Sequence, residues 1–253
     1  MLNRFKAWCE RRILNNAPIE QARWHAGLQA LPMLARLSDE ETARLRRLVT
    51  LFLHQKRFLG VRDLQVEPSM ALDIALQACL PILNLGLDWY EDWVTIIVYP
   101  DDFLTEHEYI DEAGVVHRDQ GPRSGEAWER GPVLLSWAEV AHGEALVVHE
   151  FAHTLDMRNG QANGMPPLHR DMSVDTWSRV MNEAFENLNQ SLDQDAEPPL
   201  DPYAATDPAE FFAVASEYFF ADPGTLAQSY PGVYEQFCNC YRQEPLGRFH
   251  RPG

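Results

Sequence analysis

The residues Gly143 to Met157, GEALVVHEFAHTLDM, contain the HExxH pattern at His149 to His153. Histidines four residues apart project from one face of a helix, about one turn apart, so both imidazoles can bind the same Zn²⁺ ion. Glu150 lies between them, is displaced around the helix, and can hydrogen-bond a metal-bound water instead of the metal. The stretch therefore predicts a helix that carries a metal site suited to hydrolysis.

An ordinary pair of histidines on a helix is the alternative interpretation of this motif. The chain has nine histidines, and a chance HExxH has a probability of roughly a few per cent. The preceding residues Ala145 to Val148 are all apolar, as in a helix buried under a sheet. Because an unliganded His pair with a glutamate between is costly to bury, this context favours the metal site.

A catalytic zinc site usually has three protein ligands and an open position for water, so a third ligand is expected downstream. The six residues after His153 contain no histidine, which leaves a carboxylate on a later helix. The helix expected from Pro208 offers Glu210 and Glu217, seven residues apart and so on the same face. Glu210 also fits a helix start with Asp207 as N-cap, where a glutamate occurs for capping alone. Helical spacing does not decide between the two glutamates.

The chain is expected to be helical up to about residue 60, then to form a small sheet, then to return to helices. Helical spacing indicates helices at Ala22 to Leu37, Glu40 to Leu53 (with a capping-box pattern at Ser38 and Glu41), Ala71 to Leu80, Gly143 to Met157, Val174 to Leu192 and Pro208 to Phe220. Short apolar runs indicate strands at Trp93 to Tyr99, Val115 to His117 after a turn at Asp111 to Gly114, and Pro132 to Trp137. This order predicts an α+β fold. We expect one domain over residues 1–253, in which a mainly helical N-terminal segment, residues 1–90, packs on a catalytic core, residues 91–253.

Composition excludes several classes of protein. The chain has 21 Lys and Arg against 38 Asp and Glu, a net charge of −17, and 45% of its residues are hydrophobic. These values indicate a packed core and an acidic surface that disfavours direct nucleic-acid binding. The first 20 residues interrupt their apolar positions with charges, unlike a signal peptide, and no run approaches the roughly 18 apolar residues of a membrane helix. Neither nucleic acid nor a membrane is therefore expected among the partners.

The cysteines indicate a reducing compartment. Cys9 and Cys79 are isolated, and the spacing of Cys238 and Cys240 suits neither the usual zinc pair nor a redox CxxC motif. Buried free thiols in the cytosol are the expected state.

Several stretches are similar to the Mlc titration factor A family. They are His149 to Asp156 (HEFAHTLD), Arg158 to Gly160 (RNG), Tyr203 to Glu210 (YAATDPAE), Phe212 to Phe220 (FAVASEYFF), Ile97 to Pro100 (IVYP) and Gly131 to Trp137 (GPVLLSW). The similarity covers nearly the whole chain. It implies a cytoplasmic zinc metallopeptidase of the glutamate-zincin type with aminopeptidase activity, related in its catalytic domain to the anthrax lethal factor protease.

The resemblance also implies site residues and partners. It makes His149, His153 and Glu210 the ligands of one Zn²⁺ per chain, Glu150 the general base and acid, and Tyr203 a hydroxyl near the metal. Peptides are the implied substrates. In enteric bacteria the family also binds the glucose repressor Mlc and so modulates expression of the glucose phosphotransferase system. The −17 charge is compatible with a basic partner.

The residues leave some roles open. Asp156 could orient a ligand imidazole or be an exposed aspartate at the end of a helix, and Glu217 could also orient an imidazole. The run Pro132 to Trp137 could be a sheet edge that pairs with the substrate backbone, or a core strand.

Alternative functions also remain. The protein could be a repressor-sequestering regulator whose zinc site is structural or vestigial, but Glu150 would then have no purpose. Another zinc hydrolase, such as a deaminase, is disfavoured because the Cys pair of that ligand set is missing.

Overall fold

The structure, a computed structural model of the 253-residue chain, describes residues 2–104, 107–110, 116–119, 122–123, 125–127, 131–142 and 145–249. The helices, including short 3₁₀ turns labelled η, are α1 (Leu2–Asn16), α2 (Gln21–Ala30), η1 (Pro32–Leu34), α3 (Asp39–Gln55), α4 (Pro68–Cys79), η2 (Leu87–Tyr90), α5 (Trp137–His142), α6 (Leu146–Asp156), η3 (Met157–Asn159), α7 (Val174–Asp193), η4 (Pro202–Ala205), α8 (Pro208–Ala221), α9 (Pro223–Ser229), α10 (Pro231–Tyr241) and α11 (Pro245–Phe249). The strands are β1 (Arg57–Gly60), β2 (Thr95–Tyr99), β3 (Phe103–Leu104), β4 (His107–Ile110), β5 (Val116–Asp119), β6 (Pro122–Arg123), β7 (Gly125–Ala127) and β8 (Val133–Ser136). The predicted α+β fold is confirmed.

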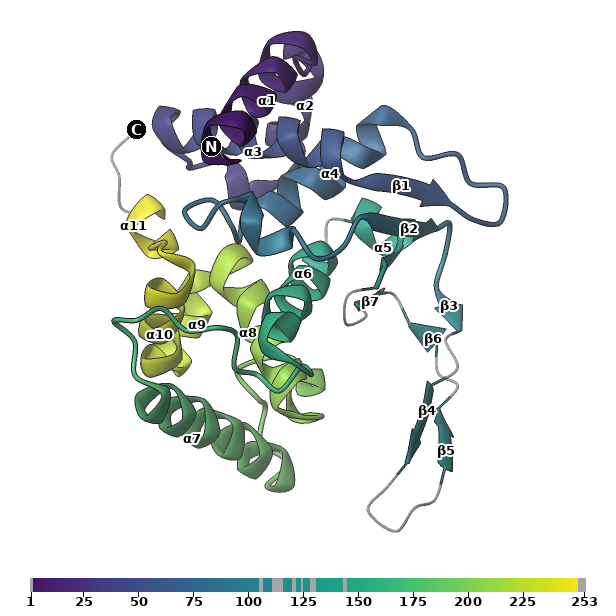
Figure 1. The fold of residues 1–253 in the computed structure, drawn as a ribbon. Coiled ribbons are helices and arrows are strands. Elements are labelled where there is room, and N and C mark those ends of the chain that lie inside the picture. Colours follow the sequence, from purple (N-terminus) through teal and green to yellow (C-terminus); the bar gives the residue numbers. More distant parts are fainter. Residues whose placement is uncertain are drawn as a thin grey trace.

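A four-stranded sheet with the order β1-β2-β8-β7 lies beside the N-terminal helices at its β1 end and beside α6 at its β7 end (Figure 1). β1, β2 and β8 are parallel, with Ile96 opposite both Phe58 and Val133, and β7 is antiparallel to β8. The run Pro132 to Trp137 is therefore a core strand: β8 has a hydrogen-bonded strand on each side, and all four of its residues are buried. The edge-strand interpretation of this run is wrong, and among the described strands β7 is the edge of the sheet next to α6.

The N-terminal segment is helical, but two of its boundaries differ from those predicted. Residues 57–60 form β1 instead of continuing α3, because their backbone pairs with β2, almost 40 residues later. The segment predicted as one helix from Ala22 to Leu37 divides into α2 and the 3₁₀ turn η1, with Pro32 at the break. The predicted capping box is confirmed: the Ser38 side chain accepts from the Glu41 amide, and the Glu41 carboxylate accepts from the Ser38 amide.

One cluster of buried residues connects the N-terminal helices with α6, α8 and α10. Phe151 of α6 packs against the rings of Phe52, Tyr90 and Trp93, whose centroids lie 5.1–5.8 Å away. The same cluster continues through α8 to the buried Tyr241 of α10. Because the N-terminal helices and the helices that follow the sheet share this core, we propose that residues 1–253 form one domain.

Two narrow ribbons extend from the sheet, β3 paired with β6 and β4 paired with β5 (Figure 1). The predicted strand Val115 to His117 corresponds to β5, although Val115 and the predicted turn Asp111 to Gly114 lie outside the described residues. Likewise, Gly143 and Glu144 of the predicted motif helix are outside them, and α6 begins at Leu146. Within the described residues, none of the helices combines the length and apolar character that crossing a bilayer requires.

Candidate metal centre

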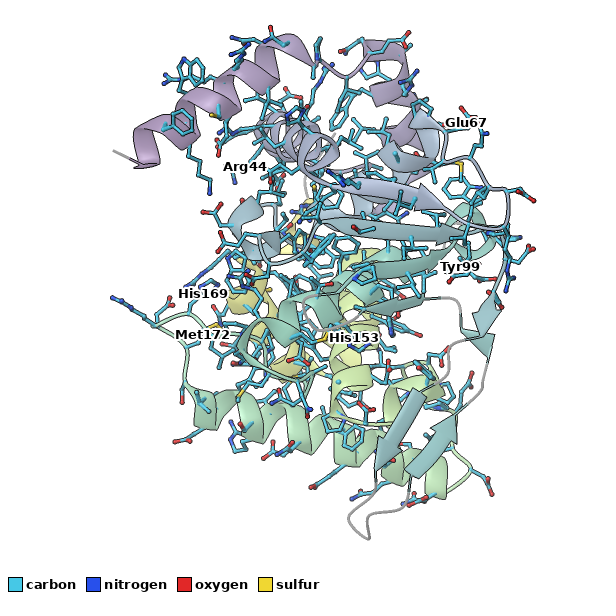
Figure 2. The ribbon with its side chains drawn as sticks, turned by 45° about the vertical axis from the view of Figure 1, so that its right-hand side comes forward. Arg44, Glu67, Tyr99, His153, His169 and Met172 are labelled. Carbon is cyan, nitrogen blue, oxygen red and sulfur yellow. The ribbon has the colours of Figure 1, made fainter. Side chains whose placement is uncertain are left out.

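The α6 helix holds the HExxH motif under the sheet, where one side of the helix is apolar. Val147, Val148, Phe151 and Ala152 are fully buried in the core. The opposite side packs along α8, and His149 and His153 lie there, one turn apart. Figure 2 shows His153 in the interior, between the sheet and α7. Burial of the apolar side therefore fixes the direction in which both imidazoles point.

Three potential ligand atoms converge at this surface of α6. Nε2 of His149 lies 3.2 Å from Nε2 of His153. Oε2 of Glu210 lies 3.1 Å from the first nitrogen and 3.3 Å from the second. Among the residues that the structure describes, these three form the group of His, Cys, Asp and Glu side chains able to hold a metal ion.

The spacing of these atoms suits a tetrahedral metal site. With bonds of about 2.0–2.1 Å, neighbouring ligands of a tetrahedral zinc lie roughly 3.3–3.4 Å apart, close to the observed separations. A proton on Nδ1 of His149 can be donated to Glu217, whose Oε1 lies 2.6 Å away. The Nε2 lone pair then faces Glu210 and His153. Three converging electron-pair donors require a cation among them, so the residues fit a metal ion.

The pKa values of the cluster also indicate that it favours positive charge. Burial by itself lowers the pKa of His149, but hydrogen bonds to Glu210 and Glu217 outweigh it and raise the pKa to about 10. Burial by itself raises the pKa of Glu210, but the two histidines hold it well below its usual value. The free protein can supply the positive charge with a proton on the His149 imidazole, and a bound cation would take over that role.

The first turn of α8 places Glu210 at the cluster. Asp207 is the N-cap, and its Oδ1 accepts from the amides of Ala209 and Glu210 at 2.8 and 3.0 Å. Pro208 occupies the first helical position. The Asp207 carboxylate thus caps the helix, and the Glu210 carboxylate contacts His149 and His153 instead. The predicted helix start at Asp207 and Pro208 is present, and so is the contact of Glu210 with the two histidines. Capping alone therefore does not account for Glu210.

Glu217 lies on the same face of α8, two turns further on. Its carboxylate approaches the other nitrogen of the His149 ring, away from the convergent atoms. It therefore occupies the place of a group that orients an imidazole, and Glu210 occupies the place of a ligand.

Glu150 and Tyr203 flank the cluster. Glu150 is buried on α6, and its charge contributes to the raised pKa of His149. The hydroxyl of Tyr203 donates to Oε1 of Glu210 at 3.2 Å, and its ring centroid lies 6.1 Å from that of His149. Tyr203 is 49% exposed, so the phenol beside the cluster reaches solvent.

Asp156 forms contacts that neither of the two roles expected from the sequence includes. It is fully buried, so the interpretation as an exposed residue at the helix end is wrong. Its Oδ2 accepts from the backbone amides of Asn163 and Gly164 at 2.8 and 2.7 Å. These bonds hold the loop after the motif helix and do not contact a ligand imidazole.

Gly164 connects that loop to α8, a role that the sequence interpretation missed. It has a φ of +78°, and a Cβ here would lie 2.4 Å from the carbonyl oxygen of Pro208. Its own carbonyl accepts from Nε1 of Trp177 at 3.0 Å. The loop thus fixes where α8 begins, two residues before Glu210. The Asn-Gly dipeptide at 163–164 was the available signal, because it marks a turn with positive φ.

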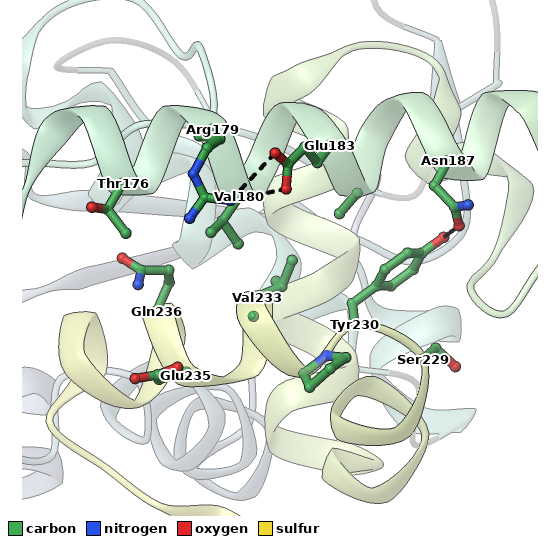
Figure 3. Close-up of a pocket in the computed structure, with 13 residues that line it drawn as sticks. Thr176, Arg179, Val180, Glu183, Asn187, Ser229, Tyr230, Val233, Glu235 and Gln236 are labelled. Atoms are coloured by element: carbon green, nitrogen blue, oxygen red, sulfur yellow. Dashed lines mark hydrogen bonds and ion pairs between the residues drawn. The ribbon is translucent and has the colours of Figure 1, made fainter.

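A separate groove of about 520 Å³ lies between α7 and α10 (Figure 3). Arg179 and Glu183 form an ion pair of 3.0 Å on its α7 side, and Tyr230 donates to Asn187 at 3.3 Å. The convergent histidines and Glu210 do not line this groove.

Known proteins resemble this chain over most of its length. The family model described as glucose-regulated metallo-peptidase M90 matches residues 5–242. The chain is 40% identical over 232 residues to Mlc titration factor A of Cronobacter sakazakii (strain ATCC BAA-894), a match that covers 89% of this chain and 87% of the relative. It is also 40% identical over 239 residues to Mlc titration factor A of Yersinia pestis (strain Pestoides F), a match that covers 91% and 87%. The region that the family model matches includes α6, α8 and the sheet.

Proposed function

Because this chain belongs to the glucose-regulated metallo-peptidase M90 family, we propose that it is a zinc-dependent peptidase with aminopeptidase activity that acts in the cytoplasm. The observation that carries the proposal is the convergence of His149, His153 and Glu210 within 3.1–3.3 Å of one another. Two imidazoles and one carboxylate are the ligand set of many zinc peptidases, in which the glutamate between the two histidines is the general base and not a ligand. Zinc is therefore the metal that this donor set supports best.

When bound, Zn²⁺ supplies a Lewis acid that makes water a nucleophile near neutral pH and polarises the scissile carbonyl. Glu150 lies on the same helix as both histidines, and its carboxylate takes the proton of the attacking water. The same carboxyl group then passes that proton to the leaving amine as the carbon–nitrogen bond breaks.

Tyr203 is the second group proposed to act on the substrate. Its hydroxyl already lies beside the ligand triad, hydrogen-bonded to Oε1 of Glu210. Rotation of the phenol toward the substrate would let it donate to the developing oxyanion. The partial exposure of the ring leaves space for that movement.

The test combines metal analysis with hydrolysis of chromogenic substrates. The purified protein should contain about one zinc per chain and release p-nitroaniline from amino-acid anilides, and a chelator should abolish this release. N-acetylated versions of the same substrates should be resistant, since an aminopeptidase requires a free α-amino group. Hydrolysis of both kinds equally would refute the aminopeptidase assignment but not the peptidase assignment.

Glu150→Gln provides the sharper test of the mechanism. This variant should keep its zinc and lose at least about a thousandfold in kcat, because only the proton acceptor changes. Glu183→Gln, a glutamate on α7 outside the cluster, is the matched control and should retain full activity. Retained turnover in Glu150→Gln would remove Glu150 from its assigned role.

A second function is supported by the names of the relatives, which describe them as titration factors of Mlc. We propose that this chain also binds the repressor Mlc and so modulates expression of the glucose phosphotransferase system. A pull-down of Mlc with Glu150→Gln separates the two functions. Binding that survives the loss of hydrolysis would assign them to independent surfaces. Binding by a protein that neither holds zinc nor cleaves any substrate would favour the alternative of a regulator with a vestigial site.

A further inference from the structure

The charges of this acidic chain are divided unevenly along it. Residues 1–60 contain 11 Lys and Arg against 5 Asp and Glu, and residues 61–253 contain 10 against 33. The net charge is therefore +6 for the first segment and −23 for the second. Helices α1, α2 and α3 of the first segment lie together at one end of the molecule, with α1 on the outside (Figure 1). An anionic surface would attract this end and repel the rest.

The outer side of α1 carries two exposed aromatic side chains. Phe5 is 68% exposed and Trp8 is 51% exposed, although both are large and apolar. Their rings stack with centroids 6.0 Å apart and an interplanar angle of 26°. The inner side of α1 is partly buried against α3, where Glu10 pairs with Arg47 at 2.5 Å. The helix is thus attached to the protein by one side and presents an aromatic pair on the other.

Two arginines lie beside the aromatic pair on the outer side of α1. The guanidinium of Arg12 lies 5.7 Å above the Trp8 ring, and Nε of Arg11 donates to the carbonyl of Ala7 at 3.2 Å. Neither arginine forms an ion pair with a carboxylate of the residues that the structure describes. This differs from Arg44 and Arg47 of α3, which do. The positive charge next to Phe5 and Trp8 is therefore available to an external anion.

We propose that the α1 face, defined by Phe5, Trp8, Arg11 and Arg12, docks on an anionic lipid bilayer. Trp and Phe enter the boundary between headgroups and acyl chains, and arginines bind lipid phosphates. The face is the convex outer surface of a single helix, and none of its four residues lines the grooves at α7, α8 or α10. Two exposed aromatic rings beside these two arginines match the apolar and anionic layers of such a bilayer.

This proposal departs from the expectation that no membrane is a partner. Docking by one face of a surface helix requires neither a membrane-spanning segment nor a positive net charge of the whole chain. The proposal is independent of the metal site, because α1 lies on the outside of the N-terminal helices (Figure 1) and shares no residue with the site.

Co-sedimentation with vesicles tests the proposal on the full chain. The protein should bind vesicles that contain phosphatidylcholine and phosphatidylglycerol in a ratio of about 7:3, but not pure phosphatidylcholine, and high salt should weaken binding. Phe5→Ser combined with Trp8→Ser should lower the partition coefficient by about tenfold or more. Arg11→Gln combined with Arg12→Gln should lower it by a similar factor and flatten its salt dependence.

Matched variants elsewhere keep the test specific. Leu59→Ser with Val174→Ser removes two equally exposed apolar side chains, and Arg170→Gln with Arg179→Gln removes two exposed charges; both pairs should bind like the unchanged protein. Circular dichroism and the metal content should be the same for all variants. Failure to bind the anionic vesicles, or equal binding by the α1 variants, overturns the proposal. Equally strong, salt-sensitive binding to duplex DNA, lost in the same α1 variants, also overturns it, because the face would then recognise any polyanion.

Discussion

Oε1 of Glu217 lies 2.6 Å from Nδ1 of His149, and Oε2 of Glu210 lies 3.1 Å from Nε2 of the same ring. One imidazole thus connects two glutamates that are two turns apart on α8. The hydrogen bond to Glu217 fixes the His149 tautomer whose Nε2 is free to bind a metal, and it holds the plane of the ring toward His153 and Glu210.

Glu217→Gln should lower zinc affinity by about 10- to 100-fold while leaving a stoichiometry of one, because a neutral amide holds the imidazole less firmly. Glu210→Ala should reduce affinity much more, since it removes a ligand. Competition against a chromogenic chelator measures both, with Glu183→Gln as the control. If Glu217→Ala abolishes metal binding and Glu210→Ala does not, the two assignments must be exchanged.

Tyr203→Phe should reduce kcat by about 10²-fold or more with little change in KM, because its hydroxyl is proposed to act only on the transition state. Zinc content should stay at one per chain, since the phenol is hydrogen-bonded to Glu210 but is not in the ligand group. Tyr230→Phe, which removes a hydroxyl bonded to Asn187, is the matched control. A loss of zinc in Tyr203→Phe would instead show that the phenol supports the ligand.

Gly164→Ala should lower the free energy of unfolding by about 1–3 kcal/mol, because the residue has a positive φ and its Cβ would meet the Pro208 carbonyl. Displacement of the start of α8 should also weaken zinc binding. Gly224→Ala is the control, since a Cβ there meets only a side-chain oxygen of Asp222 at 3.5 Å, and its stability should change by less than about 1 kcal/mol. Urea titration of the metal-free proteins checks the prediction, and equal midpoints for the two variants would contradict it.

Glu41 should contribute to stability only when it is ionised. Burial by itself raises its pKa, but the Ser38 amide and Arg248 outweigh burial and lower it. Because the pKa is lower in the folded state, this contribution is present above the unfolded pKa of about 4.3 and is lost as the pH falls through the folded value.

Glu41→Gln should therefore destabilise the protein by about 1–3 kcal/mol at pH 7 and by much less near pH 3. Denaturant unfolding at several pH values measures the difference between the two proteins. The matched control is Glu40→Gln, whose partner Arg44 forms only an exposed pair. A difference that stays constant from pH 7 to pH 3 would show that the carboxylate charge is not the cause.

Most of the local structure of the site follows from neighbouring residues in the sequence. Apolar residues before His149 and histidines at positions i and i+4 predict a helix with two imidazoles on one side, and α6 is that helix. The Asp207-Pro208 start of α8 and the Ser38–Glu41 capping box follow from short-range hydrogen bonding, which depends only on residues close in the chain. These features were predicted correctly because their energies are local.

The packing of distant segments determines which strands are central and what each carboxylate contacts. Residues 57–60 become a strand, and β8 becomes a core strand between β2 and β7, because β2 pairs with both β1 and β8 although each lies almost 40 residues from it in the chain. No local pattern encodes these pairings. Asp156 is buried because the loop folds back to place two amides on it. Glu210 and Glu217 share a helix face and are equivalent by periodicity. The packing of α8 along α6 brings Glu210 to Nε2 and Glu217 to Nδ1 of His149. The two glutamates differ because the two nitrogens of the imidazole face different turns of α8.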